Sequence, residues 1–386
     1  MASIKKDMGN VPNKIPRLRF PGFEGEWEEK KLGNLLEFKN GINATKEQYG
    51  QGVKFINVLD ILNNDFITYE NVIGKVDIDI ATIDKFSVQY GDILFQRSSE
   101  TREEVGTANV YLDKEKKAAF GGFVIRGRKI GYYNPIFFNK LLKTNSARDS
   151  ITSKSGGSTR FNVGQDTLSS VELCFPSIKE QAKIGKFLSL LDERIATQNK
   201  IIGQLETLIK GLYQKLILDR VPNTKISDCV SCYSSSLTES TVIDKNGTYP
   251  VYGATGIIAF TENYQINEDA VLIIKDGSGV GKVQYGMDKF SVIGTLNYLT
   301  AKSKVNLRYI YFCLKFFNFE KYKVGSGIPH IYFKDYGEAF IYCPSLDEQI
   351  KIGSLLSSID EKIKIGKTLL LQYDIQKQYL LKNLFI

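Results

Sequence analysis

The chain has 386 residues, of which 42% are hydrophobic and 24% charged, and its net charge is +8 at neutral pH. This length suffices for two or three domains, and the positive charge is compatible with a polyanionic partner without requiring one. No apolar run approaches the roughly 20 residues of a membrane span and the polar first residues lack a signal-peptide core, so we expect a cytoplasmic protein with no membrane contact.

The first part of the chain carries short apolar runs that fit β-strands. These are Val53–Val58, Asp92–Phe95 and Phe123–Arg126, and clusters of Gly, Asn and Asp separate them. The amphipathic stretch Pro135–Thr144 fits a short helix, for which Asn134 is a suitable N-cap. We expect a mixed α/β region that is rich in strands.

Two loops of this region are rich in the side-chain types that contact DNA. Base edges are read by Arg, Lys, Asn, Gln, Ser and Thr, and phosphates by Lys, Arg and hydroxyl groups. The candidates are Gln96, Arg97, Ser98, Arg102, Lys154, Ser155, Ser158, Thr159, Arg160 and Asn162. Taken singly, each fits a solvated loop side chain better, so the prediction rests on the stretches as wholes.

A long helix is predicted after Pro176, because proline suits a helix start and glutamate suits the first turns. Apolar residues then recur at alternating spacings of four and three, the pattern of a coiled-coil seam. This seam contains Ile184, Leu188, Leu191, Ile195, Gln198, Ile202 and Leu205 and continues to Leu216. A second seam near the end of the chain contains Ile352, Leu356, Ile359, Ile363, Gly366 and Leu370 and continues to Leu384.

The cysteines give little support for a metal site. Cys229-Val-Ser-Cys232 is a lone C-x-x-C, whereas a structural zinc needs four ligands, usually from two such pairs. The chain has five cysteines and one histidine. We therefore expect no metal and reduced, mostly buried thiols.

The run Val271–Val283, VLIIKDGSGVGKV, resembles a strand that leads into a phosphate-binding loop. A P-loop needs G-x-x-x-x-G-K-[ST], because backbone N–H groups surround the phosphates and the hydroxyl binds Mg²⁺. Asp276 stands where the first glycine is required, and Val283 stands where the hydroxyl is required. A glycine-rich turn between two strands is the better interpretation.

The second region has the same kinds of elements as the first. Strands are predicted at Val251–Tyr252, Val271–Ile274 and Phe340–Tyr342. A short helix is predicted at Leu307–Phe317, for which Asn306 is a suitable N-cap. Its candidates for DNA contact are Lys275, Ser278, Lys282, Lys323, Ser326 and His330. We assign no catalytic chemistry to the histidine, because it has neither a second histidine nor a nucleophile as partner.

The most informative feature is an internal repeat. Pro176–Ile195 and Pro344–Ile363 share twelve of twenty residues in the pattern P-S-x-x-E-Q-x-K-I-G-x-x-L-S-x-x-D-E-x-I, at a constant offset of 168. Weaker similarity continues upstream, where the region of Asp92 resembles that of Ala270. Each half is therefore a variable region followed by a near-constant helix.

The two seams most simply pack on one another, because a long apolar stripe left in water invites aggregation. A whole domain separates the helices, which favours an antiparallel pair. In such a pair Gln198 and Gly366 would face one another near the middle and help to fix the register. The alternative is that each helix packs separately on its own domain.

The chain resembles the specificity subunit of a type I restriction–modification enzyme. The opening segment Pro16–Gly33, GDILF at Gly91–Phe95, YPVYGATGI at Tyr249–Ile257 and the doubled helix motif carry this resemblance, which covers essentially the whole chain. It implies target-recognition domains at 1–175 and 220–343 and conserved spacer helices at 176–219 and 344–386. The expected fold is thus mixed α/β, with two β-rich recognition domains, two long antiparallel coiled-coil helices and a pseudo-two-fold repeat.

The resemblance also implies a function. Each recognition domain would read one half of an asymmetric, bipartite site in double-stranded DNA, and the helices would set the spacing and dock two modification subunits. The chain would have no catalytic activity and no cofactor of its own. Its partner subunits would use S-adenosylmethionine for adenine-N6 methylation, and ATP and Mg²⁺ for DNA cleavage by restriction subunits.

Two other classes of function stay open. A self-contained DNA methyltransferase or a P-loop NTPase would be an enzyme, but both motifs fail: Ile136 replaces the second proline of the methyltransferase pattern N/D-P-P-Y/F. A coiled-coil scaffold with no DNA role is the other alternative. Binding of S-adenosylmethionine or ATP by the chain would favour an enzyme, and failure of the assembled complex to bind DNA would favour a scaffold.

Overall fold

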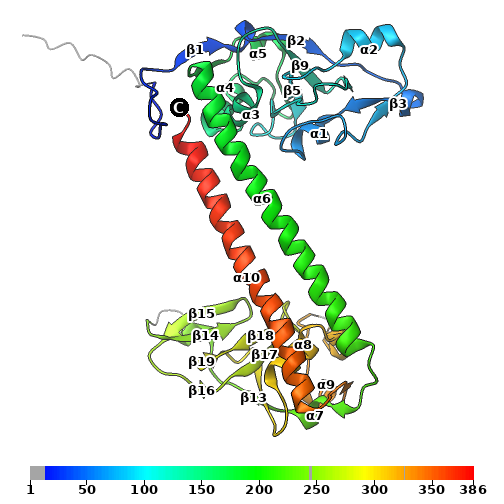
Figure 1. Ribbon diagram of the computed structural model, residues 1–386, viewed down its shortest axis with the longest axis vertical. Coiled ribbons are helices and arrows are strands. Elements are labelled where there is room, and N and C mark those ends of the chain that lie inside the picture. Colours follow the sequence, from blue (N-terminus) through cyan, green and yellow to red (C-terminus); the bar gives the residue numbers. More distant parts are fainter. Residues whose placement is uncertain (1–13, 243–245, 326) are drawn as a thin grey trace, which may run out of the picture. The chain divides into compact units, whose positions relative to one another are not determined.

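The computed structural model describes residues 14–242, 246–325 and 327–386 (Figure 1). Two compact units divide the chain: unit 1 comprises Met1–Thr197 and Leu370–Ile386, and unit 2 comprises Gln198–Leu369. Both long helices therefore contribute to both units. The four segments predicted above, 1–175, 176–219, 220–343 and 344–386, follow the sequence repeat instead of compactness, and their bounds stay a prediction.

Unit 1 is built on a four-stranded sheet in the order β2-β9-β5-β7 and a three-stranded sheet in the order β4-β3-β8. The strands are β2 (Leu36–Asn40), β9 (Val124–Lys129), β5 (Ile93–Gln96), β7 (Ala108–Val110), β4 (Lys75–Val76), β3 (Tyr49–Ile56) and β8 (Ala119–Phe120). A two-stranded ribbon pairs β1 (Glu28–Lys31) with β11 (Glu172–Phe175). The short helices are α1 (Val58–Leu62), α2 (Ile80–Phe86), α3 (Pro135–Leu141), α4 (Asn145–Thr152) and α5 (Gln165–Ser169).

Unit 2 has two four-stranded sheets, in the orders β13-β20-β17-β18 and β15-β14-β19-β16. The strands are β13 (Val230–Ser234), β20 (Leu296–Ala301), β17 (Ala270–Ile274), β18 (Val283–Gly286), β15 (Gly256–Thr261), β14 (Tyr249–Gly253), β19 (Lys289–Val292) and β16 (Ile266–Asn267). A two-stranded ribbon pairs β12 (Thr224–Lys225) with β21 (Phe340–Ile341). The short helices are α7 (Ile226–Cys229), α8 (Leu307–Lys315) and α9 (Phe333–Tyr336).

The predicted strands and short helices overlap observed elements, but several of their ends differ, and two of these differences have a clear local cause. Val58, predicted to end a strand, begins α1. The stretch Pro135–Thr144, predicted as one helix, ends at Leu141 because Thr144 caps the next helix. The hydroxyl of Thr144 donates to Leu141 O at 2.8 Å and accepts from Ala147 N at 3.3 Å, which closes one helix and starts the other.

The two long helices are α6 (Ile178–Tyr213) and α10 (Leu346–Asn383), and they pair antiparallel as predicted. In unit 1, Lys377 near the end of α10 lies 2.8 Å from Asp192 near the start of α6. In unit 2, Lys367 of α10 lies 2.6 Å from Glu206 of α6.

The predicted seam residues are all buried or half-buried, and Ile184, Leu188 and Leu191 belong to the core of unit 1. Ile184, Leu188, Leu191, Ile202, Ile352, Leu356, Ile359, Ile363 and Gly366 are buried, and Ile195, Gln198, Leu205 and Leu370 are half-buried. Gly366 and Gln198 face one another within unit 2: a Cβ atom at Gly366 would lie 2.8 Å from Gln198 Nε2. The missing side chain of the glycine thus makes room for the longer glutamine.

The repeated glutamine of the motif joins each long helix to a short one. Gln181 Oε1 accepts from the backbone N–H of Asn134 at 2.9 Å, while its Nε2 donates to Pro176 O at 2.9 Å. Gln349 makes the same two bonds, with Asn306 N at 2.9 Å and Pro344 O at 2.8 Å. Both glutamines are buried, so each N-terminus of α3 and α8 is fixed on a long helix by an amide that both donates and accepts a hydrogen bond.

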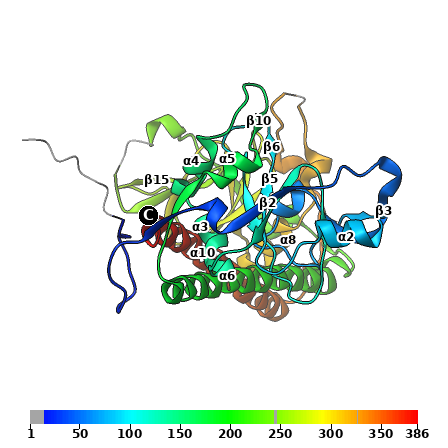
Figure 2. The same ribbon diagram turned by 90° about the horizontal axis from the view of Figure 1, so that it is seen from above.

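The side chains of Asn134 and Asn306 cap α3 and α8, as predicted, by accepting from Phe137 N and Tyr309 N. The repeated glycine of the motif lies beneath each cap. A Cβ at Gly185 would lie 3.2 Å from Asn134 Oδ1, and a Cβ at Gly353 would lie 3.0 Å from Asn306 Oδ1. Glycine therefore lets the short helix approach the long one closely; α3 lies alongside α6 in Figures 1 and 2.

The repeated aspartate of the motif forms a second join. Asp192 binds Lys140 of α3 and Lys377 of α10, and Asp360 binds Lys315 of α8 and, at 3.2 Å, Lys364. Burial opposes ionisation of both carboxylates, but the ammonium groups outweigh it and lower the pKa of each aspartate. The two acids thus stabilise the folded state in their charged form.

Gln349→Leu should lower the free energy of unfolding by about 2 kcal/mol, because it leaves the partly buried N–H of Asn306 without its acceptor. Urea unfolding followed by circular dichroism measures this change. Gln204, which is exposed on α6, provides the control, and Gln204→Leu should change the value little. Equal effects of the two substitutions would contradict the assigned role of Gln349.

Asp192→Asn and Asp360→Asn together should remove part of the dependence of stability on pH. Because the folded-state pKa of each acid is lowered, their contribution is present above the unfolded-state pKa of about 3.9 and is lost as the pH falls through the folded value. The double variant should be less stable than the wild type at pH 7 and should approach it near pH 3. Parallel curves of unfolding free energy between pH 3 and 7 would contradict this.

Candidate nucleic-acid interface

The structure brings the two polar stretches of unit 1 together. The short strand β6 (Ser98–Ser99) pairs antiparallel with β10 (Phe161–Asn162), so that Ser98 lies opposite Asn162. Val163 N donates to Arg97 O at 3.0 Å, which extends the pairing. We call residues 96–102 together with 154–162 ribbon 1.

Unit 2 contains an equivalent of this arrangement. The backbones of Asp276 and His330 form an isolated antiparallel β-bridge, and Ile331 N donates to Lys275 O at 2.9 Å. His330 and Ile331 are the repeat counterparts of Asn162 and Val163 at the offset of 168. We call residues 275–282 together with 323–330 ribbon 2.

Each ribbon contains a hairpin that closes on itself. In ribbon 1, Gly156 and Asn162 exchange two backbone hydrogen bonds, at 3.0 and 2.8 Å, and in ribbon 2 Val324 and His330 exchange two at 2.9 and 2.8 Å. The following residues, Gly157 and Gly325, have φ of 112° and 93°, which favours glycine. The two hairpins share their backbone bonds while the side chains at their tips differ.

Most candidates of ribbon 1 are accessible. Arg97, Arg102, Lys154, Ser158, Thr159, Arg160 and Asn162 are exposed, and Ser98 is half-buried. Gln96 and Ser155 are buried, where Gln96 Nε2 donates to Ser98 O at 3.0 Å and Ser155 Oγ donates to Thr152 O at 2.7 Å. Lys154 Nζ donates to Ser170 O at 2.9 Å. The exposed cations that remain are three arginines.

Aromatic rings support two of these arginines. The guanidinium of Arg102 lies 5.3 Å from the ring centre of Phe161, and that of Arg160 lies 6.0 Å from the ring centre of Phe123. Phe123 is itself exposed. Its exposure was not predicted, and the pattern Phe-Val-Ile-Arg around it reads only as a strand.

In ribbon 2 the candidates border an open depression of about 970 Å³, which Ser278, Lys282 and Lys323 help to line. Ser278 and Lys282 are exposed, whereas Lys275 and Lys323 are half-buried, and Lys323 pairs with Glu320 at 2.6 Å. Ser326 lies outside the described residues. His330 Nδ1 lies 2.6 Å from Asp276 Oδ1, and this aspartate was not among the predicted residues.

The glycine-rich loop of ribbon 2 is a turn between antiparallel strands, β17 and β18. A P-loop delivers its phosphates to the N-terminus of a helix, whereas Val283 here begins a strand. The Asp276 carboxylate, which replaces the first glycine, is engaged by His330. The geometry therefore contradicts the NTPase alternative.

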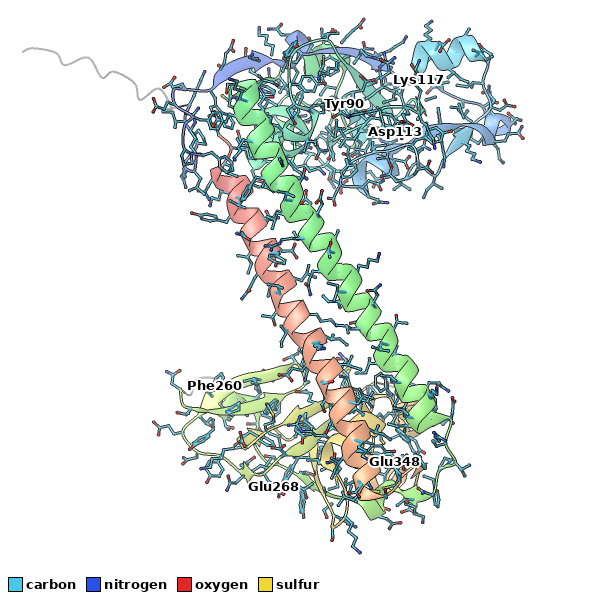
Figure 3. The ribbon with its side chains drawn as sticks, viewed as in Figure 1. Tyr90, Asp113, Lys117, Phe260, Glu268 and Glu348 are labelled. Carbon is cyan, nitrogen blue, oxygen red and sulfur yellow. The ribbon has the colours of Figure 1, made fainter. Side chains whose placement is uncertain are left out.

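Several motif residues are identical in both copies and yet exposed. Lys183 and Lys351 are exposed, as are Glu193 and Glu361. Glu180 is buried by Arg19, whose guanidinium binds it at 2.8 Å through two nitrogens. Its counterpart Glu348, on the first turns of α10 in Figure 3, is exposed. Lys183 lies 5.6 Å from the ring centre of Phe20, whereas the exposure of Lys351, Glu193 and Glu361 leaves them accessible to a partner.

Three observations concern metal binding, membrane insertion and the cysteines. Within the described residues, no group of three or more metal-binding side chains occurs. No helix in that part of the chain is long and apolar enough to cross a membrane. The thiol of Cys229 lies 3.9 Å from that of Cys343, and all five cysteines are free.

Two curated relatives are similar to part of the chain. The type I restriction enzyme MjaIX specificity subunit of Methanocaldococcus jannaschii is 26% identical over 56% of this chain and 46% of its own length. The type I restriction enzyme HindI specificity subunit of Haemophilus influenzae is 27% identical over 51% of this chain and 42% of its own length. The chain thus spans about half the length of the curated relatives that it matches.

A solved structure shares the fold over most of the chain. The type I restriction–modification S subunit from M. genitalium has a TM-score of 0.71 and 19% identity, over 96% of this chain and 99% of that one. A sequence model described as the type I restriction modification DNA specificity domain matches residues 24–207 and 225–372. These two segments span most of the sequence, so the chain belongs to the family of type I restriction modification DNA specificity domains.

Proposed function

We propose that this chain is the DNA sequence-recognition subunit of a type I restriction–modification complex. Ribbon 1 reads one half of a bipartite site in double-stranded DNA, and ribbon 2 reads the other half. The paired helices α6 and α10 set the distance between the half-sites. The chain itself catalyses no reaction.

The observation that carries this proposal is the pair of equivalent ribbons. Their backbone hydrogen bonds match at repeat positions, for example Val163 N to Arg97 O and Ile331 N to Lys275 O. Their side chains differ: Ser98 and Asn162 in one correspond to Asp276 and His330 in the other. Bases are read by hydrogen bonds from side chains to their edges, so different side chains on the same backbone arrangement fit an asymmetric target.

Ribbon 1 supports the proposal through its charge. Arg97, Arg102 and Arg160 are exposed cations that suit phosphate contact or guanine recognition. The phenylalanine rings beside Arg102 and Arg160 restrict the guanidinium groups and reduce the entropy lost on binding. Because Gln96 and Ser155 are buried, we leave them out of the proposed contact surface.

Residues that are identical in the two long helices and also exposed support two docking sites for one kind of partner. One lysine of the motif (Lys183 in α6, Lys351 in α10) and one glutamate (Glu193 in α6, Glu361 in α10) are identical in both copies. All four side chains are exposed. Exposed apolar residues, Phe187 and Leu355, occupy the same repeat position beside them. We propose that two modification subunits dock here and that restriction subunits join the assembly.

The chemistry of the complex belongs, in this proposal, to the partner subunits. They would hold S-adenosylmethionine for adenine-N6 methylation, and ATP with Mg²⁺ for cleavage. We include a cytoplasmic location, because the subunit must reach the DNA. A self-contained methyltransferase is disfavoured, since Asn134 of its partial motif serves as a helix cap, and a scaffold without DNA contact does not explain the cationic ribbons.

Arg97→Ala and Arg160→Ala should each weaken DNA binding by the assembled complex. A lost phosphate contact lowers the slope of log K against log salt by about one, whereas a lost base contact relaxes one position of one half-site. Mobility shift across a salt series separates these outcomes. The control is Lys46→Ala, at an exposed cation outside ribbon 1; an effect equal to that of the arginines would contradict the assignment.

The helix pair provides the main test of the proposed function. Inserting seven residues after Gln198 and seven after Gly366 preserves the seam, and it lengthens both helices by about 10 Å at 1.5 Å per residue. The spacer of the methylated site should then grow by about three base pairs, at 3.4 Å each, while both half-sites stay the same. Methylation mapping measures this.

Insertion into α6 alone is the matched control, because it breaks the register and should abolish assembly. An unchanged spacer in an active double-insertion complex would refute the role of the helices in setting the distance. A complex of wild-type chain that methylates DNA without sequence preference would refute the proposed function as a whole.

A further inference from the structure

The single histidine of the chain occupies a distinctive position in ribbon 2. His330 lies where Asn162 lies in ribbon 1, and Asp276 lies opposite it where Ser98 lies opposite Asn162. Two neutral polar residues in one copy thus correspond to an imidazole and a carboxylate in the other. The backbone bonds around both pairs are the same.

The imidazole of His330 is positioned by one acidic and one aromatic neighbour. Nδ1 lies 2.6 Å from Asp276 Oδ1, and the ring is stacked on Tyr332 at a centre-to-centre distance of 6.5 Å and an angle of 14°. A side chain fixed in this way loses little freedom when it binds a ligand.

The pair is also accessible, since the side chain of His330 is 37% exposed and that of Asp276 is 32% exposed. An ionised carboxylate can only accept a hydrogen bond, so Nδ1 must be the donor. In the neutral ring Nε2 is then a hydrogen-bond acceptor. In the major groove, acceptors recognise the amino groups of adenine and cytosine.

We propose that His330 is a specificity-determining residue of the half-site read by ribbon 2, and that Asp276 is its positioning residue. His330 Nε2 accepts a hydrogen bond from the exocyclic amino group of one adenine or cytosine, and Asp276 fixes the tautomer and the ring. This inference rests on the proposed DNA-reading function. It concerns one base of one half-site.

The test is methylation of a random-sequence DNA library by the assembled complex, followed by sequencing. Wild type defines both half-sites. His330→Gln presents either an acceptor or a donor, so discrimination at one base position should fall at least tenfold, in line with the discrimination a good base contact gives. Asp276→Asn should relax the same position, because the ring loses the partner that fixes its tautomer.

Matched substitutions in ribbon 1 provide the control. Ser98→Ala with Asn162→Ala should alter only the other half-site, and thermal unfolding checks that all variants are folded. An unchanged motif in both His330→Gln and Asp276→Asn would overturn the inference, as would a uniform loss of methylation over all sequences. Absence of any sequence preference in the wild-type complex would instead count against the proposed function.

Discussion

The fold depends on one buried amide in each half of the chain. Gln181 and Gln349 each join the carbonyl of a preceding proline to the N-terminus of a short helix, α3 or α8. Because the amide is buried, losing either bond leaves a polar group without water or partner. Each strand-rich part therefore meets its long helix in one orientation. The neighbouring glycine and aspartate of the motif strengthen the same junction through close approach and charge.

This junction explains why the repeat is dense in one place and sparse elsewhere. The residues at the junction are constrained by direct bonds to a second element, as Asp192 is by Lys140 and Asp360 by Lys315. The strands before it need only suitable apolar side chains, which several residue types supply. Twelve identities in twenty residues thus mark a structural contact, together with a few exposed positions that a partner would explain.

Sequence reasoning succeeded where a pattern has one physical cause. The 4-3 spacing predicted the paired helices, and Asn134 and Asn306 were recognised as caps from their position before an amphipathic stretch. It failed where two distant segments decide the outcome. Gln96 is buried by residues that are distant in the sequence, so no local pattern predicts its burial. The contact between Asp276 and His330 was missed because the two residues are 54 positions apart in the sequence. The helix break at Thr144 was also missed, although threonine before a short polar helix was a usable signal.

The closed hairpins have a consequence for the evolution of such a protein. Because the hydrogen bonds between Gly156 and Asn162 and between Val324 and His330 use backbone atoms alone, the tip residues carry little of the folding energy. Side chains such as Ser158, Thr159 and Arg160 can therefore be exchanged with small effects on stability. Under the proposed function, single substitutions in one hairpin would change the target preference, while the long helices, and the partners that we propose dock on them, would stay compatible with the altered chain.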